Sequence, residues 1–272
     1  MAPAPPPDPA AQELAATTGS IKSAERVLQI LELVARHTDG ISATGIRAAL
    51  HLPKSSLHGL LRVLCDRGYL WVDPDTRVYR IGLHAWEVGQ AYSPTRNVTV
   101  LVGPVMRALR DELNETVQLA VLDGLDNVYL AKEESDHPLR LVVSGVGLRL
   151  PAHTTALGKV LLAGLPAAEL RRRLAGATLR RFTRSTVSDK AELLRRLAAV
   201  RAKGYGEDDG EYTVGLYCVA VPVRDPDGAV IAAVSCSIPS ARAGSDGDRA
   251  QRYLPALRAS AARLAPLLVP LA

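Results

Sequence analysis

The clearest hydrophobic pattern of the chain lies between residues 52 and 64. Leu57, Leu60, Leu61 and Leu64 recur at i, i+3, i+4 and i+7, which is the spacing that buries one stripe of a helix. The opposite side of this helix is polar and basic near its start, and such side chains donate hydrogen bonds to phosphates and base edges in the major groove of DNA. The pattern therefore predicts a helix that reads DNA. The candidate DNA-contacting residues on it are Lys54, Ser55, Ser56, His58 and Arg62.

Two helices are predicted before this one. Ser23 suits the cap of a first helix that ends near His37, since apolar residues recur there every three or four positions. Ser42 suits the cap of a short second helix that ends near Leu50. Pro53 then fits the first turn of the third helix, where the N–H that proline lacks has no helical partner. The order helix, helix, turn, helix is that of a helix-turn-helix motif.

A hairpin is predicted after the third helix, which Gly68 ends. Residues 69–72 and 78–81 are rich in aromatic and β-branched side chains, and a turn-forming segment with Asp and Pro separates them. A two-stranded ribbon at this place is the wing of a winged helix-turn-helix, and Arg77 and Arg80 on it are candidates for contacts with the DNA backbone or the adjacent minor groove. Taken one at a time, basic residues of this kind more often belong to a solvated face. The order of the elements favours DNA.

The second part of the chain alternates between strand-like and helix-like segments. Antiparallel strands with helices packed on them make an α+β domain of a ligand-binding type. The expected strands are 117–122, 127–134, 139–144, 216–223 and 229–237, and the expected helices are a linking helix at 83–92, one from Pro104 to Asn114, then 155–165, 167–174, one capped by Ser188 that ends at Gly204, and one at 249–267.

Composition limits the class of protein and its cellular compartment. The 272 residues suffice for two modest domains, and no run of about 18 uncharged apolar residues predicts a membrane span. The first residues are rich in Ala and Pro without a basic segment before an apolar one, which predicts a disordered tail rather than a signal peptide. Three widely spaced cysteines favour a reducing cytoplasm over a disulfide framework. The net charge is +5, but residues 21–92 carry nine Lys and Arg against seven Asp and Glu, so charge alone does not reveal a DNA-binding domain.

Motifs of enzyme chemistry are incomplete. Lys159 follows a glycine as in a phosphate-binding loop, but His153 replaces the first Gly of that pattern and Val160 replaces its Ser or Thr. The glycines within 145–147 lack the third Gly of a dinucleotide fingerprint, and no G-x-S-x-G elbow occurs. The acidic residues within 208–211 have no matching His or Cys cluster. No catalytic residue, metal ligand or cofactor is predicted.

A binding pocket accounts for the remaining polar residues. A helix that begins near Thr154 and Thr155 would aim its free N–H groups at a carboxylate. Alternation along the last strand places Ser235 and Ser237 on one face and Cys236 on the other. Two hydroxyls on one face can fix a small polar ligand. Simple strand packing explains the two serines equally well, so the residues alone leave this question open.

A set of motifs runs through the chain in a fixed order. The motifs are IKSAERVLQILEL at 21–33, LPKSSLH at 52–58, GY at 68–69, YRIG at 79–82, LPAHTTALGK at 150–159, GYGEDD at 204–209, GLYCVAVPV at 215–223 and SCS at 235–237. This set resembles the IclR-type transcriptional regulators, and the resemblance covers nearly everything after the N-terminal tail.

The resemblance implies a two-domain fold. An N-terminal winged helix-turn-helix with a small β wing is followed by a linker helix and by a C-terminal, GAF-like α+β effector domain with an antiparallel sheet. The expected divisions are a disordered tail at 1–19, the DNA-binding domain at 20–82, the linker helix at 83–98, and the effector-binding and oligomerisation domain at 99–272.

The resemblance also implies an effector site for small organic acids, keto acids and aromatic acids among them. Leu157 stands where some members have a smaller residue, which affects the size of the pocket. The residues that form the site match Ala156, Leu157, Asp208, Cys218, Ser235 and Ser237, and its apolar wall matches Leu139, Val142, Leu150 and Leu216.

The resemblance implies that the chain is a cytoplasmic repressor or activator rather than an enzyme. Homodimers or homotetramers would bind a partly palindromic promoter site on double-stranded DNA, without any membrane. Two positions depart from the family pattern: Gly59 stands where an Arg is usual, which removes a DNA contact, and Ser56 stands where a Thr is usual. The operator sequence is therefore expected to differ from those of relatives.

Two alternatives stay open at this point. One is a DNA-binding regulator whose C-terminal domain binds no ligand and has only a structural role. The other is an enzyme of small-molecule metabolism with an N-terminal interaction domain, which the absence of a catalytic constellation disfavours.

Overall fold

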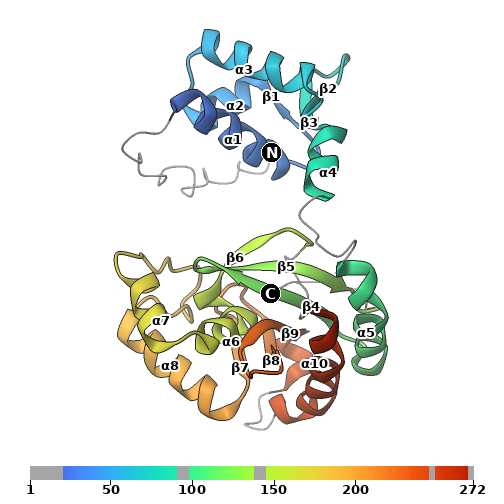
Figure 1. The fold of residues 1–272 in the computed structure, drawn as a ribbon, viewed down its shortest axis with the longest axis vertical. Coiled ribbons are helices and arrows are strands. Elements are labelled where there is room, and N and C mark those ends of the chain that lie inside the picture. The colour runs from blue at the N-terminus through green and yellow to red at the C-terminus, as the bar shows by residue number, and fades with distance from the viewer. Residues whose placement is uncertain (1–20, 91–97, 138–144, 245–248, 269–272) are drawn as a thin grey trace. The chain divides into compact units, whose positions relative to one another are not determined.

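The structure is a computed structural model that describes residues 21–90, 98–137, 145–244 and 249–268. The chain forms two compact units, Met1–Tyr92 and Ser93–Ala272 (Figure 1). Across the described residues, no helix has both the length and the apolar character needed to cross a membrane.

The first unit is a winged helix-turn-helix. Its core joins Ile30 and Val34 of the first helix, Ile46 of the second, and Leu57 and Leu61 of the third, so the predicted apolar stripes are the buried ones. The elements are α1 (Lys22–Ala35), β1 (Ile41–Ser42), α2 (Ala43–Leu50), α3 (Lys54–Asp66), β2 (Leu70–Val72), β3 (Val78–Ile81) and α4 (Leu83–Gln90). The strands form an antiparallel sheet in the order β1-β3-β2, in which the two-residue β1 adds a strand that the sequence pattern did not predict.

The helix starts show which predicted caps hold. Ser42 caps α2 as predicted, because its side chain accepts a hydrogen bond from the N–H of Gly45 at 3.1 Å. The predicted cap of α1 at Ser23 is wrong: Ile21 is the capping residue without a side-chain bond, and its carbonyl already accepts helical hydrogen bonds. Pro53 precedes α3 instead of lying in its first turn, since its ψ of 141° is extended while its carbonyl accepts from the N–H of Leu57.

Special backbone conformations shape the turns of this unit. His51 has a φ of 50° and forms the turn between α2 and α3. Gly68 ends α3 as predicted, with a φ of 72°. A Cβ on Gly82 would lie 2.2 Å from the carbonyl oxygen of Gly68, so only glycine permits this close approach where the wing leads into α4.

The second unit is an α+β domain with a curled antiparallel sheet. Among the described residues the sheet has six strands in the order β6-β5-β4-β9-β8-β7. The strands are β4 (Thr116–Asp123), β5 (Asp126–Glu133), β6 (Arg149–Pro151), β7 (Gly206–Asp209), β8 (Leu216–Arg224) and β9 (Val230–Pro239). The helices are α5 (Val98–Leu113), the 3-10 turn η2 (Ala152–Thr154), α6 (Ala156–Gly164), α7 (Ala167–Leu174), α8 (Lys190–Lys203), α9 (Ser240–Ala243), the 3-10 turn η3 (Arg249–Arg252) and α10 (Leu254–Leu268).

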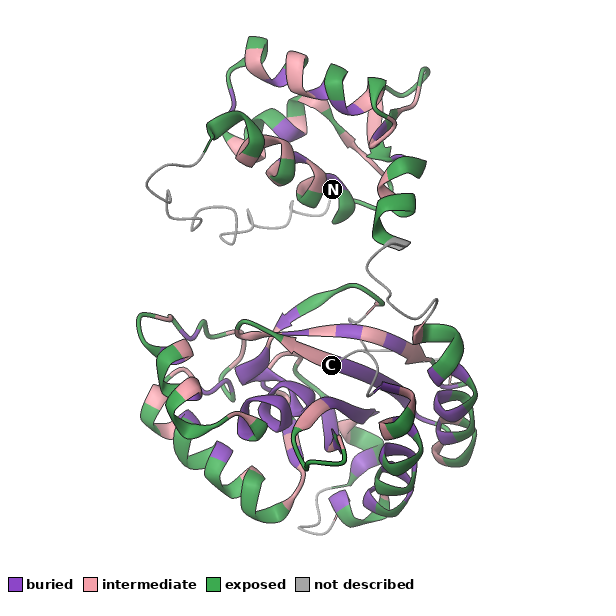
Figure 2. Ribbon diagram, viewed as in Figure 1, coloured by how far each residue is buried: buried purple, intermediate pink, exposed green. Residues whose placement is uncertain are grey.

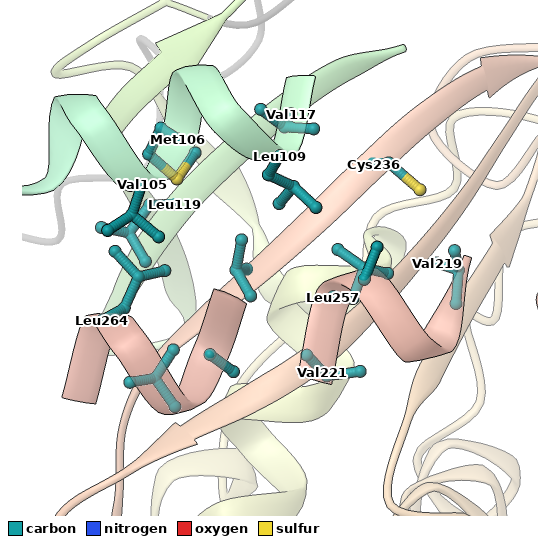
Figure 3. Packing of buried hydrophobic residues seen from close by; sticks show 14 of the residues in the cluster. Val105, Met106, Leu109, Val117, Leu119, Val219, Val221, Cys236, Leu257 and Leu264 are labelled. Atoms are coloured by element: carbon teal, nitrogen blue, oxygen red, sulfur yellow. The ribbon is translucent and has the colours of Figure 1, made fainter. Parts of the chain in front are cut away.

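Helices cover both faces of this sheet (Figures 1 and 2). Alternation along β8 sends Val219 and Val221 to the face where Met106 of α5 and Leu257 of α10 pack (Figure 3). The same alternation sends Cys218 and Ala220 to the other face, which α6 covers. A further apolar cluster joins α6 to α7 and α8. The second face therefore has an inner helix, α6, at which a small cavity forms.

Three predicted features of this unit differ in the structure. Helix α5 begins at Val98 rather than near Pro104, so Pro104 lies inside the helix, on its exposed side, and leaves the carbonyl of Val100 without a helical donor. Asp189 caps α8 in place of Ser188, since its carboxylate accepts from the N–H of Glu192 at 2.8 Å. The short strands β6 and β7 were not predicted, and the strand expected at 139–144 lies outside the described residues.

Candidate DNA-reading helix and effector pocket

Helix α3 presents its polar residues to solvent. Leu57, Leu61 and Leu64 of its apolar stripe are buried and Leu60 is half-buried. By contrast, Lys54, Ser55, His58 and Arg62 are exposed and Ser56 is half-buried. The structure thus keeps the five predicted DNA-contacting residues of α3 accessible within the first unit. A Cβ added to the neighbouring glycine, residue 59, would meet no atom within 4 Å, so no close approach inside the chain requires glycine there.

The two wing arginines are placed differently. Arg77 lies in the turn between β2 and β3 with a φ of 57°, and its exposed side chain has no partner among the described residues. The carboxylate of Asp73 fastens this turn by accepting two backbone N–H groups, which lower the pKa of Asp73. The guanidinium of Arg80 donates to the carbonyl of Asp39 at 3.2 Å and lies 6.0 Å from the ring of Trp71. Arg77 is the more available of the two for a phosphate.

A cavity opens between the start of α6 and the sheet of the second unit. Its volume is about 30 Å³, enough for water but below that of a small-molecule site, so a bound ligand would have to displace lining side chains. Eight of the ten predicted effector residues line it: Leu150, Ala156, Leu157, Asp208, Leu216, Cys218, Ser235 and Ser237. The other two, Leu139 and Val142, lie outside the described residues.

Gln118 organises the polar end of this cavity. Register pairs Gln118 of β4 with Ser235 of β9, and the side-chain oxygen of Gln118 accepts hydrogen bonds from Ser235 at 3.0 Å and from Ser237 at 3.1 Å. The Cys218 sulfur lies 3.1 Å from the Ser237 hydroxyl, and burial raises the pKa of the Cys218 thiol. The two serines therefore belong to a buried hydrogen-bonding network and not to plain strand packing.

The first turn of α6 borders the same cavity. Thr155 caps the helix by accepting from the N–H of Gly158 at 2.9 Å, and its hydroxyl donates to Asn127 at 2.7 Å. Ala156 and Leu157 are the first two helical residues, whose N–H groups have no acceptor within the helix. This is the geometry of an anion seat at a helix start.

Gly158 is needed for that geometry. A Cβ at Gly158 would lie 2.2 Å from the carbonyl oxygen of Ala152, so only glycine allows the first turn of α6 to pack so closely on η2. The glycine of the GK pair thus serves helix packing.

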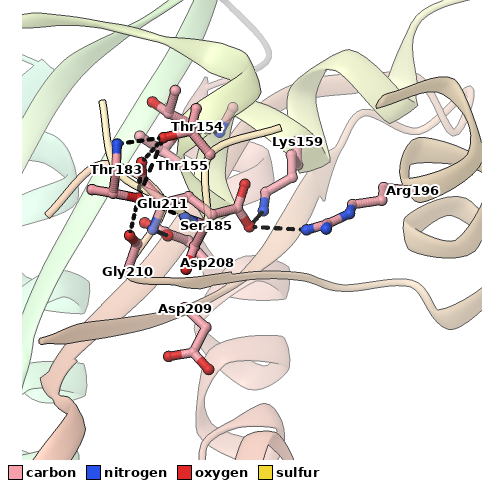
Figure 4. Close-up of polar contacts among 12 residues, drawn as sticks. Thr154, Thr155, Lys159, Thr183, Ser185, Arg196, Asp208, Asp209, Gly210 and Glu211 are labelled. Atoms are coloured by element: carbon pink, nitrogen blue, oxygen red, sulfur yellow. Dashed lines mark hydrogen bonds and ion pairs between the residues drawn. The ribbon is translucent and has the colours of Figure 1, made fainter. Parts of the chain in front are cut away.

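Lys159 belongs to a buried ionic network (Figure 4), which reaches the cavity through Asp208. Lys159 pairs with Glu211, and Arg196 lies 3.5 Å from the same carboxylate oxygen. The N–H of Glu211 donates to the Asp208 carboxylate at 2.7 Å. Burial raises the pKa of Asp208 to about 7, with the Lys159 charge acting in the opposite direction. Lys159 is therefore occupied by Glu211 rather than displayed for a phosphate.

Four lining residues escaped the sequence analysis, namely Gln118, Tyr129, Tyr212 and Thr213, whereas Thr155 was expected at the helix start that faces the ligand. Strand alternation could have placed the first two on a common face, but the partner strand was not known. Tyr212 and Thr213 lie in the loop after β7, which has no periodic pattern. In the parts of the chain that the structure describes, no cluster of three or more His, Cys, Asp or Glu could hold a metal ion.

The fold and the cavity define a class: a transcriptional regulator with a helix-turn-helix unit and a C-terminal ligand-binding unit. The family model of the IclR helix-turn-helix domain matches residues 23–74, and that of the bacterial transcriptional regulator IclR C-terminal domain matches residues 90–265. The chain belongs to the IclR family of bacterial transcriptional regulators.

Individual relatives agree with this assignment. The HTH-type transcriptional repressor AllR of Klebsiella pneumoniae is 36% identical over 238 residues, which is 88% of this chain and 87% of AllR. The HTH-type transcriptional regulator XynR of Escherichia coli K12 is 36% identical over 222 residues, 82% of this chain and 88% of XynR. A crystal structure of an IclR homologue from Microbacterium hydrocarbonoxydans, complexed with 4-hydroxybenzoate, superposes with a TM-score of 0.77 at 27% identity and covers 91% of this chain and 99% of that one.

Proposed function

We propose that this regulator binds promoter DNA through α3 and the wing, and that a small organic acid bound in the cavity of the second unit changes that binding. The observation that carries the proposal is the cavity itself, where a helix start and a network of buried hydroxyls meet. Lys54, Ser55 and His58 would contact base edges from the first turns of α3, where helix-turn-helix proteins read the major groove. Arg77 of the wing would contact a phosphate.

The chemistry of the cavity favours a carboxylate ligand. The free N–H groups of Ala156 and Leu157 suit an oxyanion, and the hydroxyls of Ser235 and Ser237 can turn from Gln118 toward it. Asp208 is compatible with an anion because a carboxyl with a pKa of about 7 is largely protonated in slightly acidic solution and donates a hydrogen bond. The 4-hydroxybenzoate bound by the Microbacterium homologue is a small organic acid of the proposed kind.

Self-association belongs to the proposal. Exposed apolar side chains of the first unit, with Leu83 at 71% and Trp86 at 60% exposure, support pairing of two copies. A symmetric pair would read the two halves of a partly palindromic operator. The regulator would act in the bacterial cytoplasm, where its DNA lies, and by binding rather than by catalysis.

Capture of genomic DNA tests the DNA-reading assignment. The full chain is mixed with sheared DNA of its host at about 0.15 M salt, where nonspecific phosphate binding is weak. We expect enrichment of a few promoters that share a palindrome, and loss of that enrichment in the K54A/H58A variant. If K54A/H58A keeps the wild-type enrichment, α3 does not read the DNA.

A ligand screen tests the cavity. Thermal unfolding is measured with organic acids, 4-hydroxybenzoate among them, because a ligand that binds the native state raises the midpoint. The shift should disappear in S235A/S237A and persist in S240A, whose serine does not line the cavity. Turnover of the bound acid would favour the enzyme alternative, and the absence of any shift across the screen would favour a ligand-free structural domain.

A further inference from the structure

The positive charge of the chain is concentrated outside the DNA-reading unit. Residues 165–203 contain eleven Lys and Arg against three Asp and Glu, a net charge of +8. The whole chain carries +5, so all other residues together carry −3. Residues 21–92, which include α3, carry only +2. The charge that a DNA-binding protein needs therefore lies mostly in the second unit.

The segment 165–203 forms one layer of that unit. Leu170 and Leu174 of α7 pack with Leu193 and Leu197 of α8 in a single apolar cluster, so the polar side chains of both helices face outward. Figure 2 shows exposed residues along these helices. The basic residues are thus spread over the outer surface of one packed layer.

Acidic neighbours neutralise only part of this charge. Arg172 and Arg173 share the single carboxylate of Glu169. In α8, Arg195 and Arg196 share that of Glu192, and Arg196 also lies 3.5 Å from Glu211, a carboxylate that Lys159 already neutralises. Each cluster keeps one positive charge in excess. Arg171, on the exposed side of α7, pairs with no carboxylate in the described part of the chain.

The connection between α7 and α8 adds three exposed arginines, none of which pairs with a carboxylate among residues that the structure describes. Arg180 lies over the ring of Phe182 at 4.9 Å, and its carbonyl lies 3.0 Å from the ring nitrogen of the buried His153. Arg181 donates to the Ser188 hydroxyl at 2.9 Å. Arg184 lines an open depression together with Arg181. The loop is held in place while its guanidinium groups stay available.

We propose that this arginine surface, formed by Arg171, Arg172, Arg180, Arg181, Arg184 and Arg195, binds the phosphate backbone of DNA next to the operator. Arginine binds phosphate through charge-assisted and often bidentate hydrogen bonds, and such contacts need no particular base sequence. The proposal rests on the proposed function, since promoter binding by α3 brings the duplex to the protein. It also compensates for the weak net charge of the first unit, which is only +2 over residues 21–92.

The salt dependence of DNA affinity tests the proposal. The full chain is titrated with a labelled mixed-sequence duplex of about 30 base pairs at KCl concentrations from about 0.05 to 0.2 M, where each lost phosphate contact lowers the log–log slope by about 0.9. The test variant is R180Q/R184Q. The matched control is R258Q/R263Q, which removes the same charge from two exposed arginines of α10 that have no acidic partner among the described residues.

We expect the slope of R180Q/R184Q to fall by about 1.8 while R258Q/R263Q keeps the wild-type slope. A wild-type slope for R180Q/R184Q, or equal losses in the two variants, would overturn the proposal; the first result would point to an acidic protein as the partner of this surface. The captured promoter fragment separates the two claims. If the wild-type chain binds that fragment specifically while R180Q/R184Q keeps its slope, only the arginine surface fails. If the wild-type chain binds no duplex, both fail.

Discussion

Replacing Asp208 by Asn should make the second unit more stable at alkaline pH. Burial raises the pKa of Asp208 from 3.8 to about 7 in the folded chain, so between these values the native state holds a proton that the unfolded state has lost. Stability then falls as the pH rises through this interval. The asparagine amide has the shape of the protonated acid, its oxygen can accept from the N–H of Glu211, and it has no ionised form to destabilise.

The size of the stability difference follows from the interval between the folded-state and unfolded-state pKa values of Asp208. Each pH unit between the two pKa values corresponds to about 1.4 kcal/mol, so the wild-type chain loses about 3 kcal/mol relative to D208N between pH 5 and pH 8. Other titrating groups change the stability of both proteins and cancel in the difference. The free energy of unfolding of D208N should therefore exceed that of wild type by a margin that grows up to a pH of about 7 and then stays constant.

Chemical denaturation followed by far-ultraviolet circular dichroism measures this margin. Both tryptophans, Trp71 and Trp86, lie in the first unit, so their fluorescence reports the unfolding of that unit. A dichroism transition that the fluorescence does not follow is then the unfolding of the second unit. A difference between D208N and wild type that is the same at pH 5 and pH 8 would refute the reasoning, because it would mean that Asp208 titrates alike in the folded and unfolded chain.

Local packing makes three further predictions. Gly158→Ala should lower the free energy of unfolding of the second unit by about 3 kcal/mol in the dichroism transition, because its Cβ would lie 2.2 Å from the backbone oxygen of Ala152. Gly59→Ala should raise that of the first unit by up to about 1 kcal/mol in the fluorescence transition, because its Cβ meets no atom and alanine favours the helix. Ser42→Ala should lower it by about 1 kcal/mol, because the N–H of Gly45 loses its acceptor. A G158A chain as stable as wild type, a destabilised G59A or a neutral S42A would contradict the respective prediction.

Periodic segments could be predicted from the sequence because their signal is local. The leucine stripe of α3 and the alternation of β8 and β9 each extend over several residues of one element. Strands β1, β6 and β7 have two to four residues, too few for a period, and they form only because a partner strand lies beside them. The position of a helix cap could be predicted only to within one residue where two neighbouring side chains can both cap, as with Ser188 and Asp189.

The residues of the cavity also divide into those that a local pattern could predict and those that it could not. Ser235 and Ser237 stood out by their alternation, and the resemblance to the family supplied Asp208 and Cys218. Gln118 could not be found in this way, because its role depends on the pairing of β4 with β9, strands that lie more than a hundred residues apart in the chain. Likewise, the burial that shifts the pKa of Asp208 comes from packing that no local pattern shows.

The most direct test of the account is whether the cavity controls DNA binding. The dissociation constant for a captured promoter fragment is measured with and without an acid that raises the unfolding temperature, for the wild-type chain and for S235A/S237A. The account predicts that the acid changes the wild-type constant by about 5- to 150-fold, as is typical of coupled sites, and leaves that of S235A/S237A unchanged. An unchanged wild-type constant while the acid is bound would contradict it.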